Sequence, residues 1–192
     1  MIGVMRWPGR RGWVAASAIA ALLAYAAPAG AQTQEVPIAG GTLSAPPDTL
    51  SWSASAIPQG LETASTSVLV DVASSSGRSQ AYGARFVGAN VPARGIDGAT
   101  EFRPFERPTR AAIVVGATGR RVRAVKIYFR DGGKKRARTR AGAGDWGTSY
   151  RYFAVGRVVS ASRAGARRVT QKIEALDADG DVISTTREIY PV

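Results

Sequence analysis

The sequence contains no cysteine and no histidine among its 192 residues. Without cysteine the fold has no disulfides, so packing alone must hold it together. The two absences also exclude Cys or His nucleophiles, His-containing triads, and metal sites built from thiolates or imidazoles. The chain has no Gly-x-Ser-x-Gly elbow and no phosphate-binding loop that ends in Gly-Lys-Ser/Thr. We therefore expect a protein that is not an enzyme and uses no cofactor.

Acidic residues are also scarce, with 14 Asp and Glu against 26 Lys and Arg, which gives a net charge of +12. Residues 1–31 carry three of the arginines and no acid, so the charge falls only to +9 if that segment is removed. A surface of this kind attracts anionic partners. Nucleic acid is among them, although a basic protein can bind DNA adventitiously.

The first 31 residues have the layout of a secretory signal peptide. A basic start precedes an apolar run from Trp13 to Ala27 and the small-residue site Ala29-Gly30-Ala31. A retained membrane anchor is the alternative, but the run is shorter than the roughly 20 residues that span a bilayer. We expect cleavage after Ala31, a secreted or periplasmic location, and no integral membrane segment in the remaining chain.

The remaining chain reads as a short tail followed by one all-β domain. Residues 32–48 are rich in Pro, Gly and Ala without periodicity, which is typical of a flexible tail. Residues 49–192 predict a single antiparallel sandwich, interrupted by a proline-containing connection at about 89–109. The strands are expected near 50–55, 65–74, 80–88, 110–116, 121–129, 134–140, 149–159, 168–176 and 181–190.

The segment "VKIYFRDGGKKRARTR" at 125–140 predicts a basic β-hairpin. Alternation along the first strand places Val125, Ile127 and Phe129 on the core face. In the second strand, only a loop with an odd number of residues keeps the arginines off the core. A three-residue loop at 131–133 ends in Gly, which suits the left-handed position of such loops. It pairs Tyr128 with Arg136 and places the following residues on one outward face: Lys126, Tyr128, Arg130, Lys134, Arg136, Arg138 and Arg140.

This face has two interpretations. It can be a solvated surface whose charges are balanced by carboxylates on neighbouring strands. It can also be a docking face for a polyanion, where the cations release counterions and Tyr128 stacks on a ring or an Arg.

Three other groups of residues are candidate sites. Asp177, Asp179 and Asp181 alternate around Gly180, a spacing that offers oxygen ligands to calcium but equally indicates a hairpin turn. Trp146 lies in a Gly-rich loop and is a candidate for contact with a partner. Acids that could serve glycoside hydrolysis, or simply solubilise the connection, are Asp97, Glu101 and Glu106.

The segments "VRAVKIYFRDGGKKRARTR", "YRYFAVGRV" and "VTQKIEALDADGDVIST" resemble the closing strands of immunoglobulin-like or fibronectin-like sandwich domains in uncharacterised secreted proteins of high-GC bacteria. The resemblance covers residues 110–190. It implies a β-sandwich and an exported location, and it carries no activity and no functional residues.

The sequence thus favours a secreted, non-catalytic β-sandwich whose basic hairpin face binds an anionic cell-envelope polymer or another polyanion. One alternative is a structural or protein–protein interaction module in which the charge serves solubility. Another is a carbohydrate-binding or glycan-active domain that uses the aromatic residues and the three acids.

Overall fold

A computed structural model describes residues 35–58, 65–87, 92–105, 110–142, 150–163 and 165–192. The expected signal peptide at 1–31, Glu106 and Trp146 lie outside these ranges. The described chain is all-β apart from one short 3-10 helix, η3 (Ala161–Arg163). The strands are β1 (Val36–Ala45), β2 (Asp48–Pro58), β3 (Ser65–Ser74), β4 (Ser79–Val87), β5 (Ile96–Phe102), β6 (Ala111–Gly119), β7 (Ala124–Phe129), β8 (Lys134–Arg138), β9 (Arg140–Ala141), β10 (Tyr150–Val158), β11 (Thr170–Leu176), β12 (Val182–Thr186) and β13 (Tyr190–Pro191).

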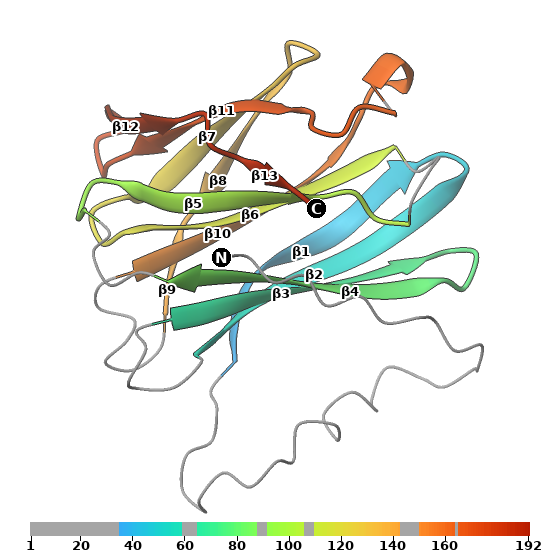
Figure 1. The fold of residues 1–192 in the computed structure, drawn as a ribbon, viewed down its shortest axis with the longest axis horizontal. Helices are drawn as coiled ribbons and strands as arrows, with labels where there is room; N and C mark the ends of the chain where they lie inside the picture. Colours follow the sequence, from blue (N-terminus) through green and yellow to red (C-terminus); the bar gives the residue numbers. More distant parts are fainter. Residues whose placement is uncertain (1–34, 59–64, 88–91, 106–109, 143–149, 164) are drawn as a thin grey trace, which may run out of the picture.

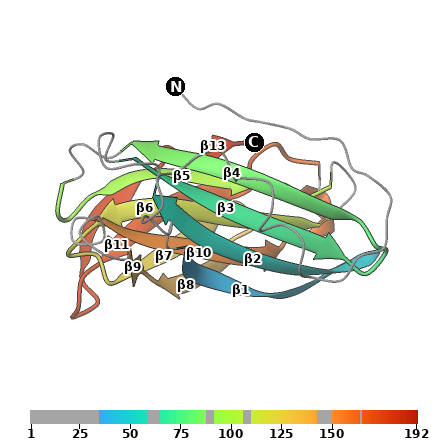
Figure 2. The ribbon, with the colours of Figure 1, turned by 90° about the horizontal axis from the view of Figure 1, so that it is seen from below.

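The strands form three sheets that stack as layers (Figure 1). The N-terminal sheet has the order β1-β2-β3-β4, the middle sheet β13-β5-β6-β10-β9, and the hairpin sheet β12-β11-β7-β8. All pairings are antiparallel except that of β13 with β5. Seen from below in Figure 2, the long strands β1 to β4 of the N-terminal sheet lie in front of the other two layers.

The middle sheet is buried on both faces, and its strands contribute to two separate cores. On β6, Ile113 and Val115 pack toward the N-terminal sheet, whereas Ala112 and Val114 pack toward the hairpin sheet. Every residue of β6 is buried. Since strand side chains alternate between faces, a strand covered on both sides must be almost entirely apolar. In the run "AAIVVGATG" only Thr118 is polar, and its hydroxyl donates to Arg151 O at 3.2 Å.

The all-β prediction is confirmed, and the antiparallel sheets are consistent with a β-sandwich. Each strand expected from the sequence corresponds to an observed strand. The two-layer, immunoglobulin-like arrangement is not confirmed, because the described strands build a third layer with a core of its own. In the part of the chain that the structure describes, no helix is long and apolar enough to span a membrane.

Two segments that were expected to be irregular are strands. Residues 36–45, expected in the tail, form β1, whose Ile38, Leu43 and Ala45 enter the core against β2. Residues 96–102, expected in the connection, form β5, which pairs with β6 inside the middle sheet. Strand β1 contains Pro37, Gly40 and Gly41, and β5 contains Gly98 within a proline-containing stretch, so neither has a clear burial pattern in the sequence.

Glycine allows close packing where β10 faces the N-terminal sheet. A Cβ added at Gly156 on β10 would lie 2.6 Å from ring atoms of Trp52 on β2. Trp52 is half-buried and packs against the core between the two sheets. The missing side chain at Gly156 therefore makes room for an indole that joins two layers.

We expect Gly156→Ala to lower the free energy of unfolding by about 1–3 kcal/mol, because the rigid indole must move to admit a methyl group. Urea denaturation followed by circular dichroism measures the loss. Gly83→Ala on β4 is the matched control, since its Cβ would lie 3.6 Å from Leu69 Cδ2, an ordinary contact. Equal stability losses in the two variants would contradict this account of Gly156.

Candidate anion-binding face

The β7–β8 hairpin has the three-residue loop that the alternation requires, but one position earlier than expected. Phe129 N donates to Gly133 O at 2.9 Å, so the loop is 130–132. Gly132 takes the left-handed conformation at φ 82°. The register consequently pairs Lys126 with Arg136 and Tyr128 with Lys134, two residues from the predicted pairing. An even shift keeps every side chain on its predicted face.

Five of the seven predicted residues share the outward face of the hairpin sheet, and two do not. Arg130 lies in the loop, since the turn begins one residue earlier than predicted. Arg140 lies on β9, where it pairs with Tyr152 in the middle sheet. The chain leaves the hairpin sheet at Thr139, whose buried hydroxyl donates to Val122 O at 2.7 Å. The residues that stay together on what we call the basic face are Lys126, Tyr128, Lys134, Arg136 and Arg138.

Strand β11 adds two charged residues to the basic face, and one of them supplies the expected balancing carboxylate. Glu174 pairs with Lys126, and Lys172 pairs with Tyr128. Glu174 accepts a hydrogen bond from Tyr128 Oη at 2.7 Å and one from Lys172 Nζ at 2.6 Å. The alternation in "TQKIEAL", with Ile173 and Ala175 facing the core, could have placed both charges on this face from sequence.

Tyr128 is held in place by its neighbours on the basic face. The Lys172 and Lys126 ammonium groups lie 4.2 and 5.1 Å from the centre of its ring, within the range of cation–π attraction. Interaction with the neighbouring Tyr128 raises the pKa of Lys126. The hydrogen bonds from Lys172 and then Tyr128 hold the pKa of Glu174 below its ordinary value. The ring expected to stack on a ligand is thus engaged by its own neighbours.

Three of the four cations of β8 have no such partner, whereas the fourth, Lys135, donates to Gly156 O at 3.0 Å. Lys134, Arg136 and Arg138 are exposed, and within the described ranges no carboxylate lies at ion-pair distance from any of them. Arg136 extends toward the β11–β12 turn, where a Cβ added at Gly180 would lie 3.9 Å from its Nη2. Charge on β8 is therefore balanced by solvent ions.

Other arginines near the hairpin have structural partners. Arg157 on β10 forms an ion pair with Asp131 at 2.7 Å and lies over the Phe129 ring at 4.2 Å. Its guanidinium fills the space beside Gly133, where an added Cβ would lie 2.1 Å from Nη1. Arg151 donates to Thr139 Oγ1 at 2.8 Å and to Thr139 O at 2.9 Å. Arg157 therefore fixes the hairpin turn, and Arg151 fixes the crossing to β9.

The acids considered for glycoside hydrolysis do not form an accessible pair in the described structure. Glu101 is fully buried, and its two oxygens accept hydrogen bonds from Val169 N at 2.9 Å and Thr170 N at 2.8 Å. Asp97 lies at the surface, where partial burial raises the pKa of its carboxyl. Glu101 organises the start of β11.

The acidic triplet forms a turn. Asp177 Oδ1 accepts from the backbone N–H groups of Asp179, Gly180 and Asp181 at 3.0–3.1 Å, and Gly180 has φ 91°. In the ranges that the structure covers, no three acidic side chains gather as a metal site would require. Asp177 Oδ1 therefore serves the turn, as the alternative interpretation of this spacing expects.

We expect Glu174→Gln to lower stability by about 1 kcal/mol at neutral pH, since Lys172, the ion-pair partner of Glu174, is partly exposed to solvent. The folded state lowers the pKa of this carboxyl, so its contribution is present above the ordinary value of 4.5 and is lost as pH falls through the folded pKa. Urea denaturation of both proteins between pH 7 and pH 3 should show the gap closing. A constant gap across that range would contradict the role of the ionised carboxylate.

The arrangement can thus hold an extended anion against β8, with Lys126 and Lys172 beside it on a self-braced surface. Comparison with known proteins adds no candidate activity to this geometry. No family model matches the chain, and searches of the curated proteins and of the solved structures find no match.

Proposed function

We propose that this chain is an exported, non-catalytic β-sandwich protein that binds an anionic envelope polymer along β8. The observation that carries the proposal is the row of exposed, unpaired cations Lys134, Arg136 and Arg138. The signal-like segment at 1–31 supports an exported location, where such polymers occur.

The geometry of β8 favours a linear ligand over a point anion. Alternate residues of a strand project to the same side at intervals of roughly 7 Å, so the three cations form a straight row. The strand is at the edge of the hairpin sheet, which leaves one side of the row unobstructed by a neighbouring strand. A polymer lying along the edge would release counterions from all three positions at once.

The basic face also separates binding cations from bracing cations. Lys172 is committed to Glu174, and Lys126 lies against Tyr128. Neither bracing cation therefore depends on an external anion, and Lys134, Arg136 and Arg138 can be replaced without removing a contact of the core. This independence makes the row suitable for substitution experiments.

Retention on phosphocellulose across a salt series tests the proposal on the chain from residue 32 onward. We expect Lys134→Gln/Arg136→Gln/Arg138→Gln to elute at much lower salt, with the slope of log affinity against log salt reduced by about one per lost contact. The matched control is Arg94→Gln/Arg120→Gln/Arg121→Gln, which removes the same charge at exposed turns beyond the other end of the hairpin.

Equal losses in the two triple variants would reduce the effect to net charge and overturn the β8 assignment. Unchanged retention in both would direct attention to the protein-interaction alternative. A DNA column run in parallel identifies adventitious binding, because a loss seen on DNA but not on phosphocellulose does not support an envelope polymer.

A further inference from the structure

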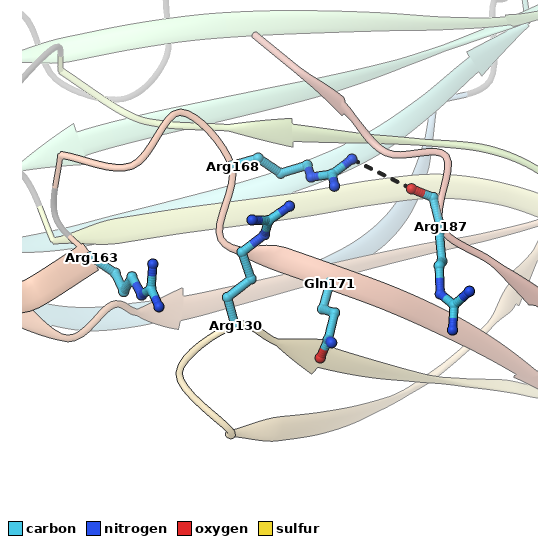
Figure 3. A pocket seen from close by; sticks show the side chains of 5 residues that line it. All are labelled: Arg130, Arg163, Arg168, Gln171 and Arg187. Carbon is cyan, nitrogen blue, oxygen red and sulfur yellow. Dashed lines mark hydrogen bonds between the residues drawn. The ribbon is translucent and has the colours of Figure 1, made fainter.

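A cavity of about 470 Å³ opens beside the hairpin turn and is lined by four arginines and one glutamine (Figure 3). The lining side chains come from four separate segments: the β7–β8 turn, η3, the start of β11 with the residues before it, and the chain between β12 and β13. They are Arg130, Arg163, Arg168, Gln171 and Arg187. We call this the arginine pocket. It is distinct from the β8 row, and the inference drawn from it does not rest on polymer binding.

The pocket has no internal counter-charge among the residues that the structure covers. None of its four guanidinium groups has a carboxylate within ion-pair distance. The nearest acid in sequence to Arg130 is Asp131, which is held by Arg157. Arginine stays protonated at any ordinary pH, so the lining keeps four positive charges whether or not a ligand is present. Four like charges this close together attract an anion.

Buried contacts below the pocket hold its segments in place. Arg130 N donates to Val169 O at 2.8 Å, which joins the turn to the start of β11. Glu101 caps the N–H groups of Val169 and Thr170 from beneath, and half-buried Arg103 donates to Ala166 O at 3.0 Å. The pocket is therefore built on a rigid base even though its side chains reach the surface.

Two details of the backbone aim the lining residues. A bulge in β11 places Thr170 opposite Phe129 and Lys172 opposite Tyr128, so Gln171 is left without a partner and turns outward beside the loop. Arg168 Nη1 donates to the carbonyls of Arg187 and Ile189, each at 3.4 Å. The hydrogen bond to Arg187 O, drawn in Figure 3, ties the segment carrying Arg187 to the residues before β11.

The lining determines the class of ligand. Pockets for small molecules are mostly apolar with a few polar groups, whereas every residue here is cationic or an amide. The volume falls in the range of a small-molecule site and exceeds what a lone ion needs. Guanidinium forks match the oxygen pairs of phosphate groups. We propose that the arginine pocket binds a chain of two or more linked phosphate groups, either free or as the diphosphate of a larger molecule.

Isothermal titration calorimetry of the chain from residue 32 onward with tripolyphosphate, ADP and inorganic phosphate tests the proposal. We expect tripolyphosphate or ADP to bind at least about tenfold more tightly than inorganic phosphate, since more charge-assisted hydrogen bonds form. Tighter binding of tripolyphosphate indicates a free phosphate chain. Tighter binding of ADP indicates a diphosphate attached to a larger group.

The test variant is Arg163→Gln/Arg187→Gln, because neither side chain makes a described contact that supports the fold. Affinity for the preferred probe should fall by about 100-fold, about tenfold for each guanidinium removed. The matched control is Arg136→Gln/Arg138→Gln, which removes the same charge from the β8 row and should retain affinity within about threefold. Circular dichroism confirms folding, and the two single variants replace the double one if it unfolds.

Absence of binding by the unsubstituted protein, equal affinity for all three anions, or equal losses in the pocket and β8 variants would overturn the proposal. The two proposals fail separately. If polymer binding depends on β8 and phosphate chains bind in the pocket, the pocket variant should keep its retention on phosphocellulose while losing the small probe. The β8 variant should show the reverse, losing retention while still binding the small probe.

Discussion

The burial of the middle sheet on both faces is the constraint on which the other features depend. Because β6 and β10 serve two cores at once, no charged side chain can project from their central residues without entering apolar surroundings. Polar groups in this layer are few and bonded, as in the contact of Tyr152 Oη with Thr66 Oγ1 at 2.8 Å. Burial raises the pKa of that phenol to about 12, so it stays a neutral hydrogen-bonding group. Cations are consequently found on the outer faces, in turns and near strand ends, as are Arg151 and Arg157 on β10.

Alternation predicted which residues of the hairpin face outward, because the parity of a loop is enough to decide a face. It did not fix the loop itself, since both 130–132 and 131–133 end in a glycine and only one has Phe129 closing against Gly133. Arg140 left the expected face because buried Thr139 carries the chain into another sheet. Local patterns determine local orientation, whereas a change of sheet depends on distant contacts.

The third layer was missed for a related reason. A strand that is apolar on both sides, such as β6, fits the interior of many folds and does not show how many sheets cover it. The arginine pocket was equally hidden, although Arg163 and Arg168 are close in sequence, because Arg130 and Arg187 join them only through the pairing of β7 with β11 and the return of the chain toward β13. Strand β1 was not predicted because Gly40 and Gly41 indicated irregular chain, although both lie within the strand.

The arginines of this chain fall into two groups, those that are bonded within the fold and those whose guanidinium groups are free to contact a ligand. Arg157 and Arg103 are side chains of the interior in practice, since they support a turn and a loop from below. The side chains of Arg136, Arg163 and Arg187 form no such hydrogen bond or ion pair with the described residues. The net charge of the sequence therefore overstates the basic surface available to a partner, and the hydrogen bonds and ion pairs distinguish the two groups.

The position of β8 at a sheet edge has a consequence for self-association. An edge strand presents unpaired N–H and C=O groups to any second strand, and proteins commonly block that contact with charge. Two copies approaching edge to edge along β8 would bring Lys134, Arg136 and Arg138 of each against those of the other. The cations for which we propose an anionic partner would thus also oppose the approach of two copies along β8. An anion that neutralises these cations would remove the repulsion between two β8 edges. Binding of such an anion would then also decide whether two copies can pair along this strand.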